Sequence, residues 1–169
     1  QNALKAISAA GLEQPTMQGA YQKVSYFRAV QHFNAIQYTA AKKLFLKSLE
    51  YPMNNVYSAL AHYWLAEIAF RADDFEGTLV ELSKFQATPG SATLSQYKRS
   101  LYSKAYAHFA KEDYTKSATA FRLFLGQQKP NTKLANDAEL RLADSYFMTG
   151  QYGNACLLYT SDAADDSDC

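Results

Sequence analysis

One pattern recurs four times along the chain and constrains its fold more than any other feature. In each copy an aromatic residue follows a short turn, and a small residue comes three positions later. The four aromatics are spaced by 37, 39 and 38 residues. Self-similarity at a period of a few tens of residues is typical of repeat architectures, so we expect a row of similar units. The aromatic and small positions are Tyr38 and Ala41, Phe75 and Thr78, Tyr114 and Ser117, and Tyr152 and Ala155.

Each unit reads as two amphipathic helices on either side of the turn. An alanine lies nine residues before each aromatic and shares a helical face with larger apolar side chains. Asp73-Asp74 and Glu112-Asp113 lie at turns and offer N-caps to the following helices. Pro52, Pro89 and Pro130 follow the second helices, and proline cannot continue a helix. We therefore predict an all-α fold of antiparallel helix pairs.

The two ends of the chain differ from this pattern. The chain begins with Gln1 and its first ten residues lack the pattern of a secretory signal, so we expect the natural start to lie upstream. Cys156 to Asp165 resembles the translation of a transposase adapter used in preparing sequencing libraries, and we expect a non-native tail. The predicted segments are a remnant over 1–20, units over 21–55, 56–94 and 95–132, an incomplete unit over 133–155, and the tail over 156–169.

Excluding the tail changes the composition that bears on function. The whole chain has 17 basic and 16 acidic side chains, a formal net charge of +1. Without the tail 17 basic side chains face 12 acidic ones, a balance of +5, and no cysteine remains. We expect Lys42, Lys43 and Lys47, which share one second helix, to lie on a solvated face, so the charge does not indicate a nucleic-acid partner.

From about Tyr21 to Ala155 the chain resembles the tetratricopeptide repeat (TPR) family. The shared features are a small residue in the first helix, an aromatic after the turn, a small residue three later and a final proline. The period is longer than the usual one of about 34 residues, and the family's tryptophan position falls on His62, beside Trp64. The resemblance implies a TPR-like α-solenoid.

Two short strings add a second resemblance. Residues 63–67 and 137–144 are similar to segments of large repeat proteins of Bacteroidetes. That similarity implies a bacterial protein, and a periplasmic or cell-envelope location in preference to the cytoplasm.

In the TPR family the first helices line a concave binding face, and the candidate site follows from that resemblance. On each first helix an aromatic or leucine is followed seven residues later by a phenylalanine, two helical turns away on the same face. Aromatic anchors with a few charges suit a peptide segment. The alternative is that these rings pack against the second helix of the preceding repeat. The candidates are Tyr26, Phe33, Tyr63, Glu67, Phe70, Arg71, Arg99, Tyr102, Tyr106, Phe109, Asp144 and Phe147.

The residues that carry chemistry do not assemble into a recognisable catalytic or metal motif. His32, His62 and His108 fall in three different units, and the glycines lack phosphate-binding spacing. No apolar run of about 20 residues predicts direct insertion into a membrane. We expect a protein that is not an enzyme and uses neither cofactor nor metal.

The sequence thus predicts a scaffold that binds a protein or peptide segment. Two alternatives stay open: a structural spacer within a longer repeat array, and a regulatory arm of a larger multidomain protein. Because the fourth unit lacks a native second helix, we expect Leu142 and Tyr146 to be poorly covered, unless Leu157, Leu158 and Tyr159 of the tail dock there.

Overall fold

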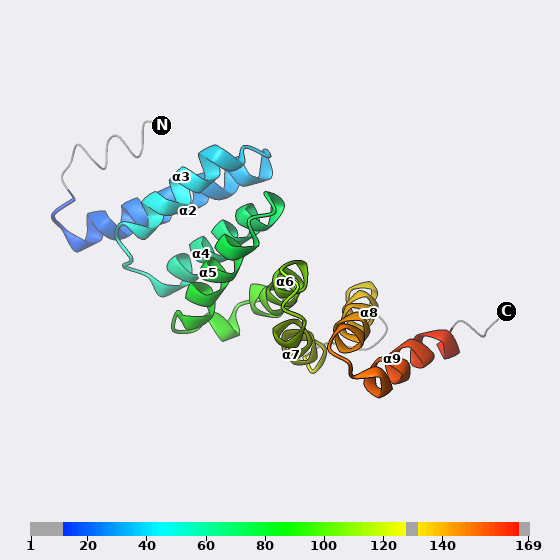
Figure 1. The fold of residues 1–169 in the computed structure, drawn as a ribbon. Coiled ribbons are helices and arrows are strands. Elements are labelled where there is room, and N and C mark those ends of the chain that lie inside the picture. Colours follow the sequence, from blue (N-terminus) through cyan, green and yellow to red (C-terminus); the bar gives the residue numbers. More distant parts are fainter. Residues whose placement is uncertain (1–11, 128–131, 166–169) are drawn as a thin grey trace. The chain divides into compact units, whose positions relative to one another are not determined.

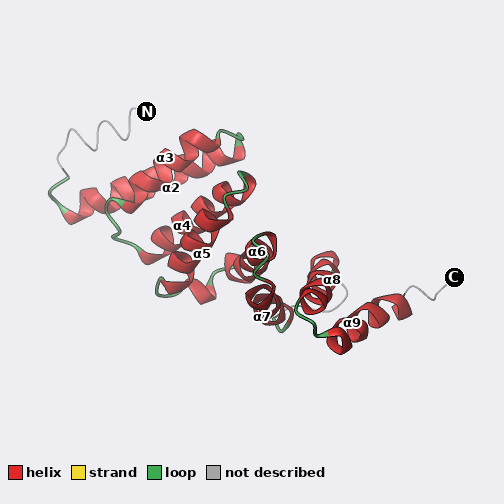
Figure 2. Cartoon of the chain, in the orientation of Figure 1, coloured by secondary structure: helices red, strands yellow, loops and turns green. Residues whose placement is uncertain are grey.

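A computed structural model of the chain describes residues 12–127 and 132–165, with side chains as far as Tyr159. Every regular element in these ranges is a helix, as Figure 2 shows. The chain divides into two compact units, residues 1–94 and residues 95–169, and each is described by itself. The division falls between the second and third of the predicted repeats.

Unit 1 contains two helix pairs and a short 3-10 turn. The first pair is α2 (Pro15–Asn34) and α3 (Tyr38–Leu49), and the second is α4 (Asn55–Arg71) and α5 (Phe75–Ala87), followed by η1 (Ser91–Thr93). The helices of each pair lie side by side in Figure 1, and α4 also packs against both α2 and α3. The two pairs therefore stack on each other. Helix α2 begins within the segment predicted as a remnant.

Unit 2 repeats this arrangement. Its helices are α6 (Gln96–Ala110), α7 (Tyr114–Leu125), α8 (Lys133–Met148) and α9 (Tyr152–Asp165). Helix α6 pairs with α7 and α8 with α9, while α8 also contacts α6 and α7. The predicted all-α fold of antiparallel helix pairs, stacked as in an α-solenoid, is confirmed within each unit.

The predicted helix boundaries agree with the structure. Asp74 is the N-cap of α5 and accepts a hydrogen bond from the Gly77 amide at 2.8 Å. Asp113 is the N-cap of α7. Pro52 and Pro89 follow the ends of α3 and α5, whereas Pro130 lies outside the described residues.

The same tight turn joins the two helices of every pair. The residue two positions before the recurring aromatic has a positive φ in each turn, and the next amide donates to the carbonyl five residues earlier at 2.9–3.0 Å. Such a left-handed residue ends a helix and reverses the chain within a few residues. The four left-handed residues are Ile36 (φ 61°), Asp73 (55°), Glu112 (60°) and Gly150 (75°).

The recurring small residues are buried where paired helices meet. All eight are at most 2% exposed, so the backbones can approach closely there. Phe45, Leu82 and Phe121, seven residues after the aromatics, are fully buried beside them. The eight small residues are Ala29, Ala41, Ala66, Thr78, Ala105, Ser117, Ala143 and Ala155.

A buried glutamine ties the two helix pairs of unit 1 together. The side chain of Gln22 on α2 donates to the Asn54 carbonyl (3.1 Å) and to Ser58 Oγ (3.0 Å), and accepts from the Asn54 amide (2.8 Å). Ser48 Oγ on α3 donates to the Gln22 carbonyl at 3.0 Å. Because both ends of the amide are satisfied, its burial adds specificity to the stacking of α2, α3 and α4.

In unit 2, hydrogen bonds from hydroxyl groups connect the two helix pairs. Ser117 Oγ on α7 donates to the Ala105 carbonyl of α6 at 3.1 Å, and Ser145 Oγ on α8 donates to Ser117 Oγ at 3.2 Å. Tyr102 on α6 donates its phenolic hydrogen to Asp137 Oδ2 on α8 at 2.6 Å. These bonds join the first pair of unit 2 to the first helix of the second pair.

The expectation of poor cover over the fourth unit is wrong for Leu142, which is only 4% exposed. Helix α9 packs against α8, and Leu158 lies against the same apolar cluster. Tyr159 donates to Asp144 Oδ1 at 2.8 Å. Residues from the segment predicted to be foreign thus dock on α8, the exception foreseen above, because they place apolar side chains at helical spacing.

The left-handed residue is isoleucine in the first turn and glycine in the fourth, so exchanging the residue type at these two positions should change the stability in opposite directions. Ile36 is β-branched and 73% exposed, so it packs little while its side chain strains the turn. We expect Ile36→Gly to raise the free energy of unfolding by about 0.5–1 kcal/mol, measured by urea denaturation. Gly150→Ala, the matched reciprocal change, should lower it by about 1 kcal/mol. A destabilised Ile36→Gly variant would contradict this account of the turn.

Candidate functional site

An aromatic pair spans every hairpin turn. In each pair the phenylalanine that ends the seven-residue spacing on the first helix contacts the aromatic that opens the second helix. The centroid distances are 5.3 Å for Phe33–Tyr38, 5.8 Å for Phe70–Phe75, 5.4 Å for Phe109–Tyr114 and 5.3 Å for Phe147–Tyr152. Such ring contacts add to the apolar burial that holds each turn closed.

In each unit an arginine from the second helix pair lies over at least one ring of the aromatic pair of the first helix pair. In unit 1 the Arg71 guanidinium is 5.5 Å from the ring centroid of Phe33 and 5.7 Å from that of Tyr38. In unit 2 the Arg141 guanidinium is 5.6 Å from the ring centroid of Phe109. These distances lie within the range of cation–π attraction. A cation from one repeat thus completes an aromatic cluster of the repeat before it.

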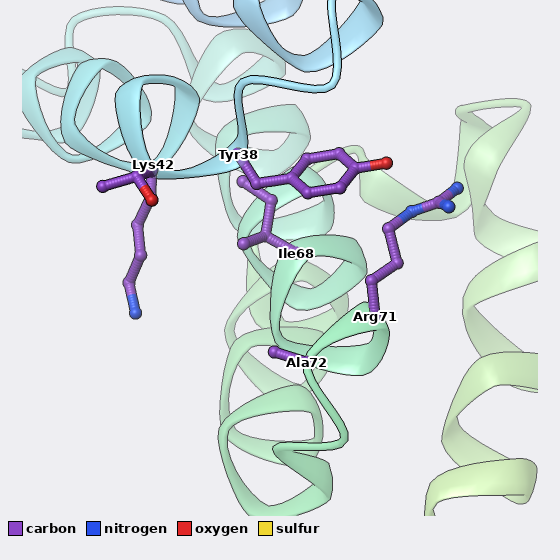
Figure 3. A pocket seen from close by; sticks show the side chains of 6 residues that line it. Tyr38, Lys42, Ile68, Arg71 and Ala72 are labelled. Carbon is purple, nitrogen blue, oxygen red and sulfur yellow. The ribbon is translucent and has the colours of Figure 1, made fainter.

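Beside the Arg71 cluster lies an open pocket of about 380 Å³. Its walls come from the start of α3 and the end of α4, as Figure 3 shows. A pocket of this size lies within the range that ligand sites occupy. We call it the Arg71 pocket, and its lining residues are Tyr38, Thr39, Lys42, Ile68, Arg71 and Ala72.

A second hollow of about 270 Å³ adjoins it and shares Lys42. It runs between α3 and α5, where Leu46 and Val80 expose apolar side chains. Asp74, Glu76 and Glu81 contribute carboxylates on the α5 side. Lys42 therefore stands between a cationic pocket and a hollow with acidic walls.

The cations of the two units differ in how their charge is balanced. Arg141 donates to Asp144 Oδ2 at 3.0 Å, and this ion pair neutralises it. Burial is the largest effect and tends to lower the pKa of Arg141, but the hydrogen bond to Asp144 and the charges of nearby acidic groups together keep the pKa above its ordinary value. Among the described residues, neither Arg71 nor Lys42 forms an ion pair. The cationic groups of the Arg71 pocket therefore have no counterion within the part of the chain that the structure describes.

The structure buries most of the site residues predicted on unit 1. Tyr26, Phe33, Tyr63 and Glu67 are each less than a tenth exposed, and Phe70 is half-buried. Tyr26 packs on Phe45 and Tyr63 on Phe85. These rings therefore lie against the second helix of their own repeat, whereas the alternative placed them against the preceding one. Of the unit 1 set, Arg71 is exposed, and it meets Phe33.

The predicted residues of unit 2 gather partly around Phe109. Tyr102, Tyr106 and Phe109 are half-buried, and Tyr106 contacts each of the other two rings. Burial, followed by the hydrogen bond to Asp137, raises the pKa of Tyr102 well above its usual range. Asp144 joins this neighbourhood through Arg141.

The remaining two predicted residues of unit 2 lie apart from that cluster. Arg99 is exposed. Phe147 is 55% exposed and contacts Tyr152, the aromatic of its own turn. A binding role for the predicted set as a whole stays a prediction.

The sequence did not indicate several residues of the Arg71 pocket. In the sequence Tyr38 marks only the phase of the repeat, and the charge pattern predicts a solvated face for Lys42. Both lie on a second helix, which the resemblance excludes from the concave face. The regular spacing of the repeats could have indicated them. When repeats stack, the start of the second helix of one repeat lies beside the end of the first helix of the following repeat, as α3 and α4 do here.

Within residues 12–127 and 132–165, no cluster of three or more histidine, cysteine or acidic side chains is placed to hold a metal ion. Over those same ranges, none of the helices has the length and apolar character needed to span a bilayer.

Comparison with models of protein families gave no match. Comparison with curated proteins likewise gave no match.

A polar cluster beside the second hollow predicts a pH dependence of stability. Glu81 on α5 pairs with His62 Nδ1 on α4 at 2.7 Å and with Lys84 Nζ at 2.7 Å. Burial tends to raise the pKa of the Glu81 carboxyl, but the bonds from His62 and Lys84 together hold it below its ordinary value. A carboxyl with a lowered pKa stabilises the fold above its unfolded pKa, and this stabilisation is lost as the pH falls through the folded value.

We expect Glu81→Gln to lower the free energy of unfolding by about 1 kcal/mol at pH 7, measured by urea denaturation. The difference from the natural chain should shrink as the pH falls from about 4.3, the ordinary pKa of a glutamate, through the lower pKa of Glu81 in the fold, because the carboxyl is then protonated in both the folded and the unfolded state. Asp73→Asn is the matched control, since Asp73 has no ion pair among the described residues and asparagine tolerates a positive φ. A gap that stays constant from pH 7 to pH 2 would show that the charge of Glu81 is not responsible.

Proposed function

We propose that this chain is a non-catalytic scaffold that binds a peptide or protein segment. The Arg71 pocket is the observation that carries the proposal, since it combines a ring face, aliphatic walls and two cations that form no ion pair with any described residue. Pockets that orient a ligand usually join apolar walls to a few polar groups in this way. The proposal keeps Phe33 and Arg71 from the predicted set and adds Tyr38, Thr39 and Lys42.

We also propose that the helix pairs are TPR-like repeats from a bacterial protein. The four turns of one geometry, the buried small residues and the aromatic pair at every turn support that relation. In a solenoid each repeat is stabilised mainly by its neighbours, which suits the stacking of consecutive pairs within each unit.

A structural spacer is the second candidate, and one observation favours it. Tyr26, Tyr63 and Glu67, which the sequence assigned to a binding face, are buried in the helix packing. Buried side chains stabilise a rod but do not reach a partner. Finding that no peptide binds would favour this candidate.

Thr39 offers a test of the scaffold that leaves the core intact. Thr39 is exposed and lines the pocket, so Thr39→Trp should fill part of it. For peptides selected from a random display library against the natural chain, we expect this change to weaken binding by about tenfold, measured by fluorescence anisotropy.

Thr115→Trp is the matched control for that experiment. Thr115 is also exposed and follows the turn aromatic of its own repeat by one residue, but it lies in unit 2. We expect its affinities to equal those of the natural chain. Equal binding by the Thr39→Trp chain would place the peptide site elsewhere, and failure to select any peptide would count against the scaffold.

A further inference from the structure

The charge of the Arg71 pocket narrows the class of segment that it can take, and this step rests on the proposed function. Arg71 is exposed at the end of α4, and its guanidinium is held over Phe33 and Tyr38. Stacking on rings orients a guanidinium while leaving its N–H donors at the edge open. An oriented guanidinium without a counterion is suited to a carboxylate, which it binds through two parallel hydrogen bonds.

Unit 2 provides an internal comparison. Arg141 also lies over the ring of the preceding repeat, but it donates to Asp144, which in turn accepts from Tyr159. The carboxylates nearest to Arg71 in sequence serve differently: Asp74 caps α5, and Asp73 occupies the left-handed turn position. Of these two stacked arginines, Arg71 is therefore the one with no carboxylate bound to it among the described residues.

The other residues that line the pocket indicate which side chains of the bound segment lie next to that carboxylate. Figure 3 shows Lys42 and Arg71 on either side of Ile68, with the Tyr38 ring reaching toward Arg71. Ile68 and Ala72 supply an apolar surface between the two cations. A bound segment therefore meets positive charge at both ends of a short apolar stretch.

We infer that the Arg71 pocket binds an acidic peptide segment in which carboxylate side chains flank an apolar one. One carboxylate binds the Arg71 guanidinium, the apolar side chain lies on Ile68, Ala72 and the Tyr38 ring, and a second carboxylate approaches Lys42. The second hollow discriminates against a long acidic run, because the carboxylates of Asp74 and Glu76 line it and repel further negative charge beyond Lys42.

Two synthetic nine-residue peptides, labelled with fluorescein, test this inference. One carries glutamates on both sides of a central leucine, and the other carries glutamines in their place. By fluorescence anisotropy we expect the glutamate peptide to bind the natural chain at least about tenfold more tightly. The preference should fall as salt rises from about 50 mM to about 500 mM, because salt screens exposed charges.

Matched variants assign the effect to the pocket. Arg71→Gln and Lys42→Ala should each weaken the glutamate peptide by about three- to tenfold and leave the glutamine peptide unchanged. Lys43→Ala removes the same charge from the adjacent exposed residue outside the pocket and should bind as the natural chain does. Thermal unfolding followed by circular dichroism checks that each variant is folded.

A second measurement reports on Arg71 directly. The glutamate peptide should shift the NMR resonance of the Arg71 Nε–H group, and this shift should be absent with the glutamine peptide. It should also be absent from Arg141, which is already paired with Asp144. This readout keeps the test valid even if one variant fails to fold.

The results separate this inference from the scaffold itself. Equal binding of the two peptides, or unchanged binding by both Arg71→Gln and Lys42→Ala, would overturn the acidic preference. If Thr39→Trp still weakened the glutamine peptide or a display-selected peptide, the scaffold would nevertheless stand. Binding of neither synthetic peptide nor of any display-selected peptide would overturn both.

Discussion

The left-handed hairpin turn is the constraint on which the rest of each unit depends. Reversal of the chain within a few residues brings the phenylalanine of the first helix onto the aromatic of the second. It also sets the buried small residues of the two helices against each other, so the backbones can approach. Without that reversal neither the aromatic pair nor the ring face beneath Arg71 would form, because both depend on residues from either side of the turn.

The stacking of pairs within a unit depends on a different interaction in each half of the chain. Unit 1 uses the buried amide of Gln22, which bonds to the loop before α4 and to Ser58. Unit 2 uses the Ser117–Ser145 contact and the bond from Tyr102 to Asp137. Apolar burial supplies most of the driving force, but it is non-directional, and these bonds fix which faces meet.

The sequence predicted the fold well because repetition turns weak local signals into a strong one. Each local signal has a physical cause: Asp74 caps a helix, Pro52 follows the end of one, and the alanines allow close helix packing. The repetition of the pattern in four copies reinforces these signals. The site was less predictable. Tyr26 and Tyr63 looked like anchors, yet spacing alone does not distinguish the face that meets the second helix from the face that meets solvent. Arg71 was predictable because it is a charged residue on an aromatic stripe, whereas Lys42 was not, because it lies on the second helix of the preceding pair.

Each arginine cluster is built from two consecutive repeats. The guanidinium that completes the ring cluster of a repeat comes from the repeat that follows it. Such a site can form only where two repeats stack, and only where the arginine of the following repeat is not already bound by a carboxylate of its own repeat. Gain or loss of a repeat would then change the valency toward a partner that carries several copies of the same segment, and avidity would change far more steeply than the affinity of any single pocket.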